Sequence, residues 1–235
     1  MKDRRNEVLA RQLLEYSVEL KKGEVLYLEI KGKETLELGK EIIRIATEKG
    51  ATTFWYYNDE SLLRQFVGAA RNEQFTRQAG LHLPLMKAAD AYIGLRGSDN
   101  PFDMADIPHE QMEMQNSLFY KPVHLEERVK RTRWVVLRFP NNAMAQLAET
   151  SQEKFESFYY DVCCADYAKM SKAQDKLKAL IDFSGIRSLT VLTMEVPCCR
   201  GLLQLARRAA AESERKIPIQ WLEIGVRGDV LQDVG

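Results

Sequence analysis

The chain has 235 residues, of which 45% are hydrophobic and 29% are charged, and its 34 Lys and Arg residues balance its 34 Asp and Glu residues. This composition is typical of a globular protein with a buried core and excludes a disordered chain. The zero net charge argues against a nucleic-acid clamp and against a polybasic membrane binder, because both normally carry a net positive field.

The first part of the chain alternates between helical and extended patterns. Apolar residues at helical spacing predict helices over residues 4–21, 35–49, 60–78, 81–89 and 104–119. Short apolar runs with β-branched and aromatic residues predict strands over residues 24–30, 52–57, 91–95 and 133–139. Strands that alternate with helices of this length are typical of βαβ units. We therefore predict an α/β fold with a mainly parallel sheet of four strands flanked by helices.

The later part of the chain changes character. Residues 141–182 are predicted to be nearly all helical, with one helix over 151–168 that has Thr150 or Ser151 as its N-cap. An appended β-α-β unit follows, with elements predicted at 188–195, 199–213 and 217–226. The only candidate domain boundary in the sequence lies at residues 183–185. We therefore predict two domains, residues 1–182 and 183–235.

Cysteine content and apolar runs bear on where the protein resides. Four cysteines are too few for a disulfide scaffold, which favours a reducing compartment. Residues 1–5 lead into a charged helix without the apolar segment of a signal peptide, and no window approaches 18 uninterrupted apolar residues. We therefore expect a cytoplasmic protein that binds neither membrane nor nucleic acid.

The histidines give a weak metal signal. His82, His109 and His124 are scattered, and none has a second histidine three or four residues away. The nearest approach to the H-E-x-x-H motif is the run from His109 to Glu113, where a glutamate stands in the place of the second imidazole. The pair could share a metal ion, but an exposed helical face explains it equally well, so we predict no metal site.

The cysteines form two vicinal pairs, Cys163–Cys164 and Cys198–Cys199. Metal knuckles separate their thiolates by two to four residues, and neighbours on a helix point about 100° apart, so one ion does not readily take both members of a pair. Cys163 and Cys164 are best explained as small packing residues. Cys198 and Cys199 open a predicted helix, where a thiol pKa can be lowered, so a reactive thiol is an alternative to simple packing there.

A glycine-containing loop follows the third predicted strand. Residues 94–97 read Gly-Leu-Arg-Gly at the end of that strand, where open α/β sheets usually bind ligands. The sequence contains neither G-x-x-x-x-G-K-[ST], nor G-x-G-x-x-G, nor G-x-S-x-G. A plain turn therefore explains the loop better than a phosphate cradle does, and we name no catalytic or cofactor-binding residue.

A more specific signal is a pattern of motifs that occur in a fixed order. The motifs are R-W-x-x-x-x-F-P from Arg133, A-M-A-Q, EKFESFYYD and KMSK, and the opening ARQLLEYSVELKKGEVLYLEI adds a helix, a Y-S-x-x-L-x-x-G stop and a strand. Over residues 1–182 the chain resembles the N-terminal domain of the aminopeptidase T (leucyl aminopeptidase) family of metallopeptidases. The resemblance implies an α/β domain of a dimeric exopeptidase that removes N-terminal residues with zinc, cobalt or magnesium.

The same resemblance implies that the metal ligands, which are glutamates, histidines and an aspartate, lie in a C-terminal domain. No residue of this chain aligns with one of them, so none is carried over. The tail, residues 188–231, departs from the family. Its M-E-V-P-C-C-x-G-L segment is similar to the last part of four-iron ferredoxin-type proteins, but the spaced cysteines of a cluster are missing, so we predict no iron–sulfur centre.

These observations give three hypotheses. The first is an aminopeptidase-family chain that lacks the metal-binding catalytic half, is inactive by itself and acts on peptides only if that half is supplied. The second is a non-catalytic module for dimerisation or binding, with a homodimer as the expected assembly. The third is a thiol or redox role through Cys198 and Cys199.

Overall fold

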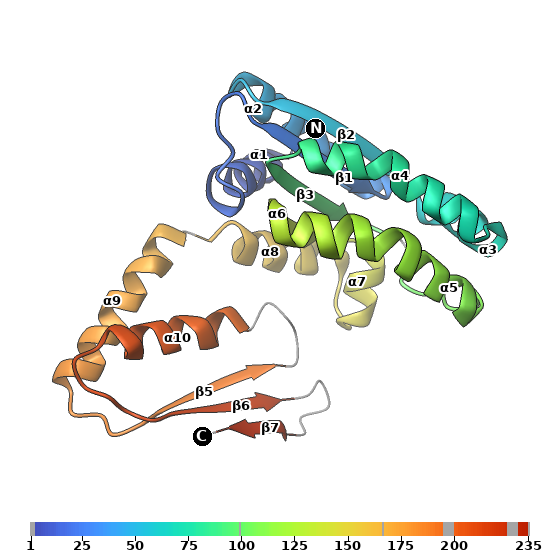
Figure 1. The fold of residues 1–235 in the computed structure, drawn as a ribbon. Coiled ribbons are helices and arrows are strands. Elements are labelled where there is room, and N and C mark those ends of the chain that lie inside the picture. The colour runs from blue at the N-terminus through green and yellow to red at the C-terminus, as the bar shows by residue number, and fades with distance from the viewer. Residues whose placement is uncertain (1–2, 99, 166, 195–199, 225–229, 235) are drawn as a thin grey trace. The chain divides into compact units, whose positions relative to one another are not determined.

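The computed structural model describes residues 3–98, 100–165, 167–194, 200–224 and 230–234 (Figure 1). It divides into two compact units, residues 1–165 and 166–235, and each unit carries its own sheet. No helix among the described residues is long and apolar enough to cross a membrane.

The first unit is a parallel sheet flanked by helices. Its strands, in the spatial order β2-β1-β3-β4, are β1 (Val25–Lys31), β2 (Thr52–Asn58), β3 (Ala91–Arg96) and β4 (Arg133–Arg138), and all neighbouring pairs are parallel. The helical segments are α1 (Arg4–Arg11), η1 (Gln12–Ser17), η2 (Lys33–Thr35), α2 (Leu36–Glu48), α3 (Glu60–Ala69), α4 (Asn72–Ala88), α5 (His109–Gln115), η3 (Asn116–Arg128), α6 (Val129–Arg131), α7 (Asn142–Leu147) and α8 (Gln152–Cys163). The predicted α/β fold and its four parallel strands are confirmed.

The two faces of this sheet differ in chemistry. One face is aliphatic: Leu28 and Ile93 are fully buried in a core with side chains from α1, η1, α2 and α8. The other face carries aromatic and charged side chains, because Tyr27 and Tyr92 pack there against Met86 of α4 and Val123 of η3. Successive residues of a strand point to opposite faces, so each strand supplies both kinds of surface.

Several predicted helix boundaries were wrong. The helix predicted over 4–21 ends at Ser17, and the helix predicted over 151–168 ends at Cys163. The break that we predicted near residue 80 lies at residues 70–71, where the side chain of Gln74 accepts a hydrogen bond from the backbone N–H of Arg71 at 2.8 Å. The helix predicted over 104–119 begins at His109 and continues through η3 and α6. Pro122 does not end this helical run, and we attribute its continuation to the burial of Val123 against the sheet.

The second unit is a small mixed sheet covered by two helices. Its elements are α9 (Tyr167–Phe183), β5 (Leu189–Met194), α10 (Arg200–Glu212), β6 (Ile219–Ile224) and β7 (Val230–Val234). Strands β5 and β6 are parallel, as the predicted β-α-β unit requires, while β7 pairs antiparallel with β6 and was not predicted.

Helix α9 belongs to the second unit. Ile181 is buried against Ala209 and Ala210 of α10, and the Arg215 guanidinium donates a hydrogen bond to the carbonyl of Ile181 at 2.8 Å. The division between compact units therefore lies one helix earlier than the boundary at residues 182/183 that the sequence resemblance predicts. That boundary concerns where the family resemblance ends, and it stays a prediction.

The turn after β1 provides a test of the tight packing at the end of the sheet. Gly32 has φ +80°, and a Cβ atom there would collide with the backbone carbonyl of Gly97. We expect Gly32→Ala to lower the free energy of unfolding by at least about 2 kcal/mol in urea titrations. Gly80→Ala in α4, where a Cβ meets open space, should instead raise it by about 0.5–1 kcal/mol. Equal effects of the two substitutions would contradict this account.

Candidate functional site

Three basic residues lie in one row at the carboxyl end of the sheet. Lys31 ends β1, Arg96 ends β3 and Arg138 ends β4, and the register pairs Lys31 with Arg96 and Arg96 with Arg138. Paired residues on neighbouring parallel strands point to the same face, about 4.8 Å apart. In the order β2-β1-β3-β4 the chain passes from β1 to β2 on one side and then crosses to β3 on the other side of β1. Open α/β sheets bind ligands at such a switch point, which here lies between β1 and β3.

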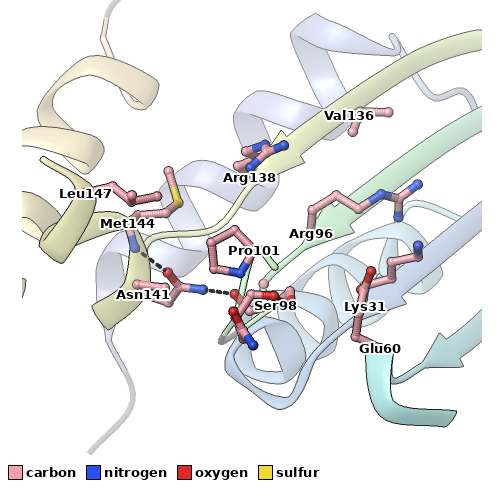
Figure 2. Close-up of a pocket in the computed structure, with 13 residues that line it drawn as sticks. Lys31, Glu60, Arg96, Ser98, Pro101, Val136, Arg138, Asn141, Met144 and Leu147 are labelled. Carbon is pink, nitrogen blue, oxygen red and sulfur yellow. Dashed lines mark hydrogen bonds between the residues drawn. The ribbon is translucent and has the colours of Figure 1, made fainter. Parts of the chain in front are cut away.

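An outer cavity of about 360 Å³ lies beside this row (Figure 2). Its wall includes the three basic residues, Ser98 and Asn141. The buried amide of Asn141 donates to the carbonyl of Ser98 at 2.6 Å, and its oxygen accepts from the backbone N–H of Met144 at 2.9 Å. This side chain therefore ties the loop after β3 to the start of α7 and fixes the shape of the cavity.

An inner cavity of about 160 Å³ lies between the sheet and the helices α4 and η3. The buried carboxylate of Glu29 lies in its wall and accepts hydrogen bonds from the Tyr92 hydroxyl and, at 3.1 Å, from the Arg96 guanidinium. Burial would raise the pKa of Glu29, but the positive charges of Arg96, His124 and Lys31 and the hydrogen bond from Tyr92 outweigh it and hold this pKa at about 2. Glu29 is therefore an ionised anchor for Arg96 at neutral pH.

Gly94 makes room for this ion pair. It faces Glu29 in the register of β1 and β3, and a Cβ at Gly94 would meet the Tyr92 hydroxyl at 3.0 Å and the Arg96 Nη2 at 3.3 Å. Gly94, which lies within β3, thus allows two side chains to reach Glu29. Gly97 lies under the outer cavity and donates to the carbonyl of Lys31 at 2.9 Å.

Two histidines that the sequence left unconnected meet in the inner cavity. His82 Nδ1 lies 2.9 Å from the Tyr27 hydroxyl, and His124 stacks on Tyr120 with ring centroids 4.9 Å apart. Burial lowers the pKa of His82, and burial lowers the pKa of His124 to about 4 against the opposing charge of Glu29. Both rings are therefore neutral at pH 7, and the buried Nδ1 of His124 has no hydrogen-bond partner.

The other residues that the sequence analysis singled out lie elsewhere. His109 and Glu113 are 3.8 Å apart on α5, with side chains 90% and 67% exposed, so they form an exposed pair on a helix. Cys163 and Cys164 are half-buried against the aliphatic core, as predicted for packing residues. Cys198 and Cys199 lie outside the described residues, and the thiol hypothesis stays a prediction.

Sequence reasoning missed Lys31, Arg138 and the approach of His82 and His124 to Glu29. A signal for the basic row was present, because Lys31 and Arg96 directly follow two of the predicted strands and Arg138 is the last residue but one of a third. The signal for the histidines was absent, because His82 lies on α4 and His124 on η3, and only packing on the sheet brings the two helices to one cavity.

A comparison with family models places these features in a known context. The model described as thermophilic metalloprotease (M29) matches residues 2–183. The chain belongs to the M29 family. A second model, of a Rossmann-like domain, matches residues 160–234, so the two matches overlap on α9. The likeness of the tail to ferredoxin-type proteins stays a prediction.

Solved structures agree with the M29 assignment at the level of the fold. Wild-type AmpT from Thermus thermophilus matches with a TM-score of 0.58 and 20% identity, covering 75% of this chain and 48% of AmpT. The chain therefore spans about half the length of AmpT. Two further structures match too weakly for any inference. A CurK enoyl reductase matches with a TM-score of 0.28 and 8% identity, covering 87% of this chain and 57% of that one. A putative NADPH:quinone reductase from Bacillus thuringiensis matches with a TM-score of 0.28 and 15% identity, covering 90% of this chain and 59% of that one. No curated protein matches.

The M29 family is a family of metalloproteases, so we tested whether side chains of this chain fit a metal ion. No group of three or more His, Cys, Asp or Glu side chains that could hold a metal ion occurs among residues 3–98, 100–165, 167–194, 200–224 and 230–234. In the inner cavity, Glu29 is engaged by Arg96 and His82 is engaged by Tyr27. These residues do not fit a metal centre, and we derive no step through one.

The buried histidine makes stability depend on pH. Between pH 6.5 and about 4 the unfolded chain binds a proton at His124 that the folded chain does not bind, so the free energy of unfolding should fall as the pH drops from 7 to 4.5. The contribution of His124 over this range is at most about 3 kcal/mol. His124→Phe should flatten the pH profile of the urea midpoint relative to the wild type. Parallel profiles for wild type and His124→Phe would contradict this assignment.

Proposed function

We propose that this chain is the α/β part of a metal-dependent aminopeptidase and that these 235 residues do not hydrolyse peptides by themselves. The match of the M29 family model over residues 2–183 carries the first part of the proposal. The second part is supported by the donor set, because peptide hydrolysis of this kind needs a metal ion to polarise the carbonyl and to generate hydroxide. The described side chains do not supply a group of ligands for that ion.

The cavity residues support a binding role for this part of the enzyme. The Glu29 carboxylate is ionised but already accepts hydrogen bonds from Arg96 and Tyr92, so it is not a free general base. His124 is neutral and buried. In contrast, the cations at the ends of β1, β3 and β4 line an open cavity, where they can attract and orient an anionic group. The non-catalytic binding module is accordingly the second candidate function, and the basic row favours it.

Hydrolysis of a leucyl chromogenic amide tests the proposal. We expect the purified chain to show no turnover above a chelator control with added zinc, cobalt or magnesium, because no described residues form a metal centre. A metal-dependent aminopeptidase known to cleave the same amide serves as a positive control for the assay. Chelator-sensitive turnover by the folded chain would overturn the proposal and direct attention to His109, Glu113, Cys198 and Cys199.

We also propose that the chain forms a homodimer, as its family resemblance implies. Multi-angle light scattering at micromolar concentration should then give twice the mass of the chain, and dilution should shift the population toward the monomer by mass action. A single species with the mass of one chain across the concentration range would contradict this proposal.

A further inference from the structure

Described carboxylates balance the charges of the basic row only in part. Arg96 is held by Glu29, but Lys31 and Arg138 form no ion pair with any described residue. Glu60 is the acidic side chain that lines the outer cavity, and no ion pair joins it to these cations. Glu29 balances the charge of Arg96, so Lys31 and Arg138 against Glu60 leave a small net positive charge on the described part of the wall. Guanidinium groups bind carboxylates and phosphates through paired hydrogen bonds.

The inner cavity has the size and lining of a site for an aromatic ring. A cavity of about 150 Å³ in another protein holds one benzene molecule, and this one measures about 160 Å³. Tyr56, Phe119 and Tyr120 contribute rings to its wall. Tyr120 is 38% exposed and Val136 is 40% exposed, so part of the lining reaches the surface and a ligand has a path inward.

The two cavities are neighbours that share part of their walls. Lys31, Arg96 and Val136 line both of them. A molecule with its charge at the row of cations therefore has room for its ring in the inner cavity. There the ring meets the side chain of His124, which lines the cavity and is 6% exposed.

We propose that the first unit binds a small organic anion that carries an aromatic ring, with its carboxylate or phosphate at Lys31, Arg96 and Arg138 and its ring in the inner cavity. This inference goes beyond the proposed function because it concerns binding and needs no hydrolysis. Peptide hydrolysis by the chain would therefore not contradict the binding proposal. A failure to bind the anion would not change the interpretation of the hydrolysis assay.

Calorimetric titration of the full chain with four probes tests the ligand class. N-acetyl-phenylalanine has ring and carboxylate, its amide has the ring alone, N-acetylglycine has the carboxylate alone, and phenyl phosphate has ring and phosphate. We expect N-acetyl-phenylalanine or phenyl phosphate to bind at least tenfold more tightly than the amide and N-acetylglycine, and the tighter of the two identifies the anion. Equal affinity for the amide would overturn the role of the cations, and equal affinity for N-acetylglycine would overturn the role of the cavity.

Variants locate the site. Arg138→Ala should weaken binding of the tighter probe about tenfold or more and reduce its salt dependence, because an exposed charge at the end of β4 is lost. Tyr120→Ala should remove the preference for probes with a ring. Arg77→Ala is the matched control, since Arg77 is an exposed arginine on α4 that lines neither cavity. Thermal unfolding checks that each variant is folded. Unchanged affinity in folded Arg138→Ala, or an equal loss in Arg77→Ala, would overturn the proposal.

Discussion

The buried carboxylate of Glu29 is the constraint on which the aromatic and charged face of the sheet in the first unit depends. It lies within β1 and is 7% exposed, and a buried carboxylate without partners would be unfavourable by several kcal/mol. The Arg96 guanidinium and the Tyr92 hydroxyl satisfy it, and both reach it because Gly94 has no side chain. One charge within a strand thus determines the residues needed at three positions of the neighbouring strand.

The position of Arg96 connects this buried pair to the outer cavity at the carboxyl end of the sheet. Because Glu29 holds its side chain, Arg96 lies in the walls of both cavities. Lys31 and Arg138 flank it in register, and neither forms an ion pair with a described acidic residue. The aliphatic face supplies most of the core by burying residues of α1, η1, α2 and α8, so the opposite face can carry polar groups without loss of the fold.

Sequence patterns predicted most of the fold and little of the site. Alternation of short apolar runs with helical spacing gave the four parallel strands correctly, because each pattern reports which residues of one element are buried. The helix break at residues 70–71 and the continuation of the helical run past Pro122 were missed, since a side-chain cap and burial against the sheet decided them. Strand β7 was missed because an antiparallel edge strand needs a partner that local patterns do not reveal.

The sequence by itself determined the α/β class and the family resemblance over residues 1–182. Only the tertiary structure decided that Lys31, Arg96 and Arg138 share one edge and one face, because this depends on the register between strands that lie far apart along the chain. The same holds for His82 and His124, which belong to different helices and meet through packing on the sheet. Periodicity describes one element at a time, whereas a site is formed where several elements meet.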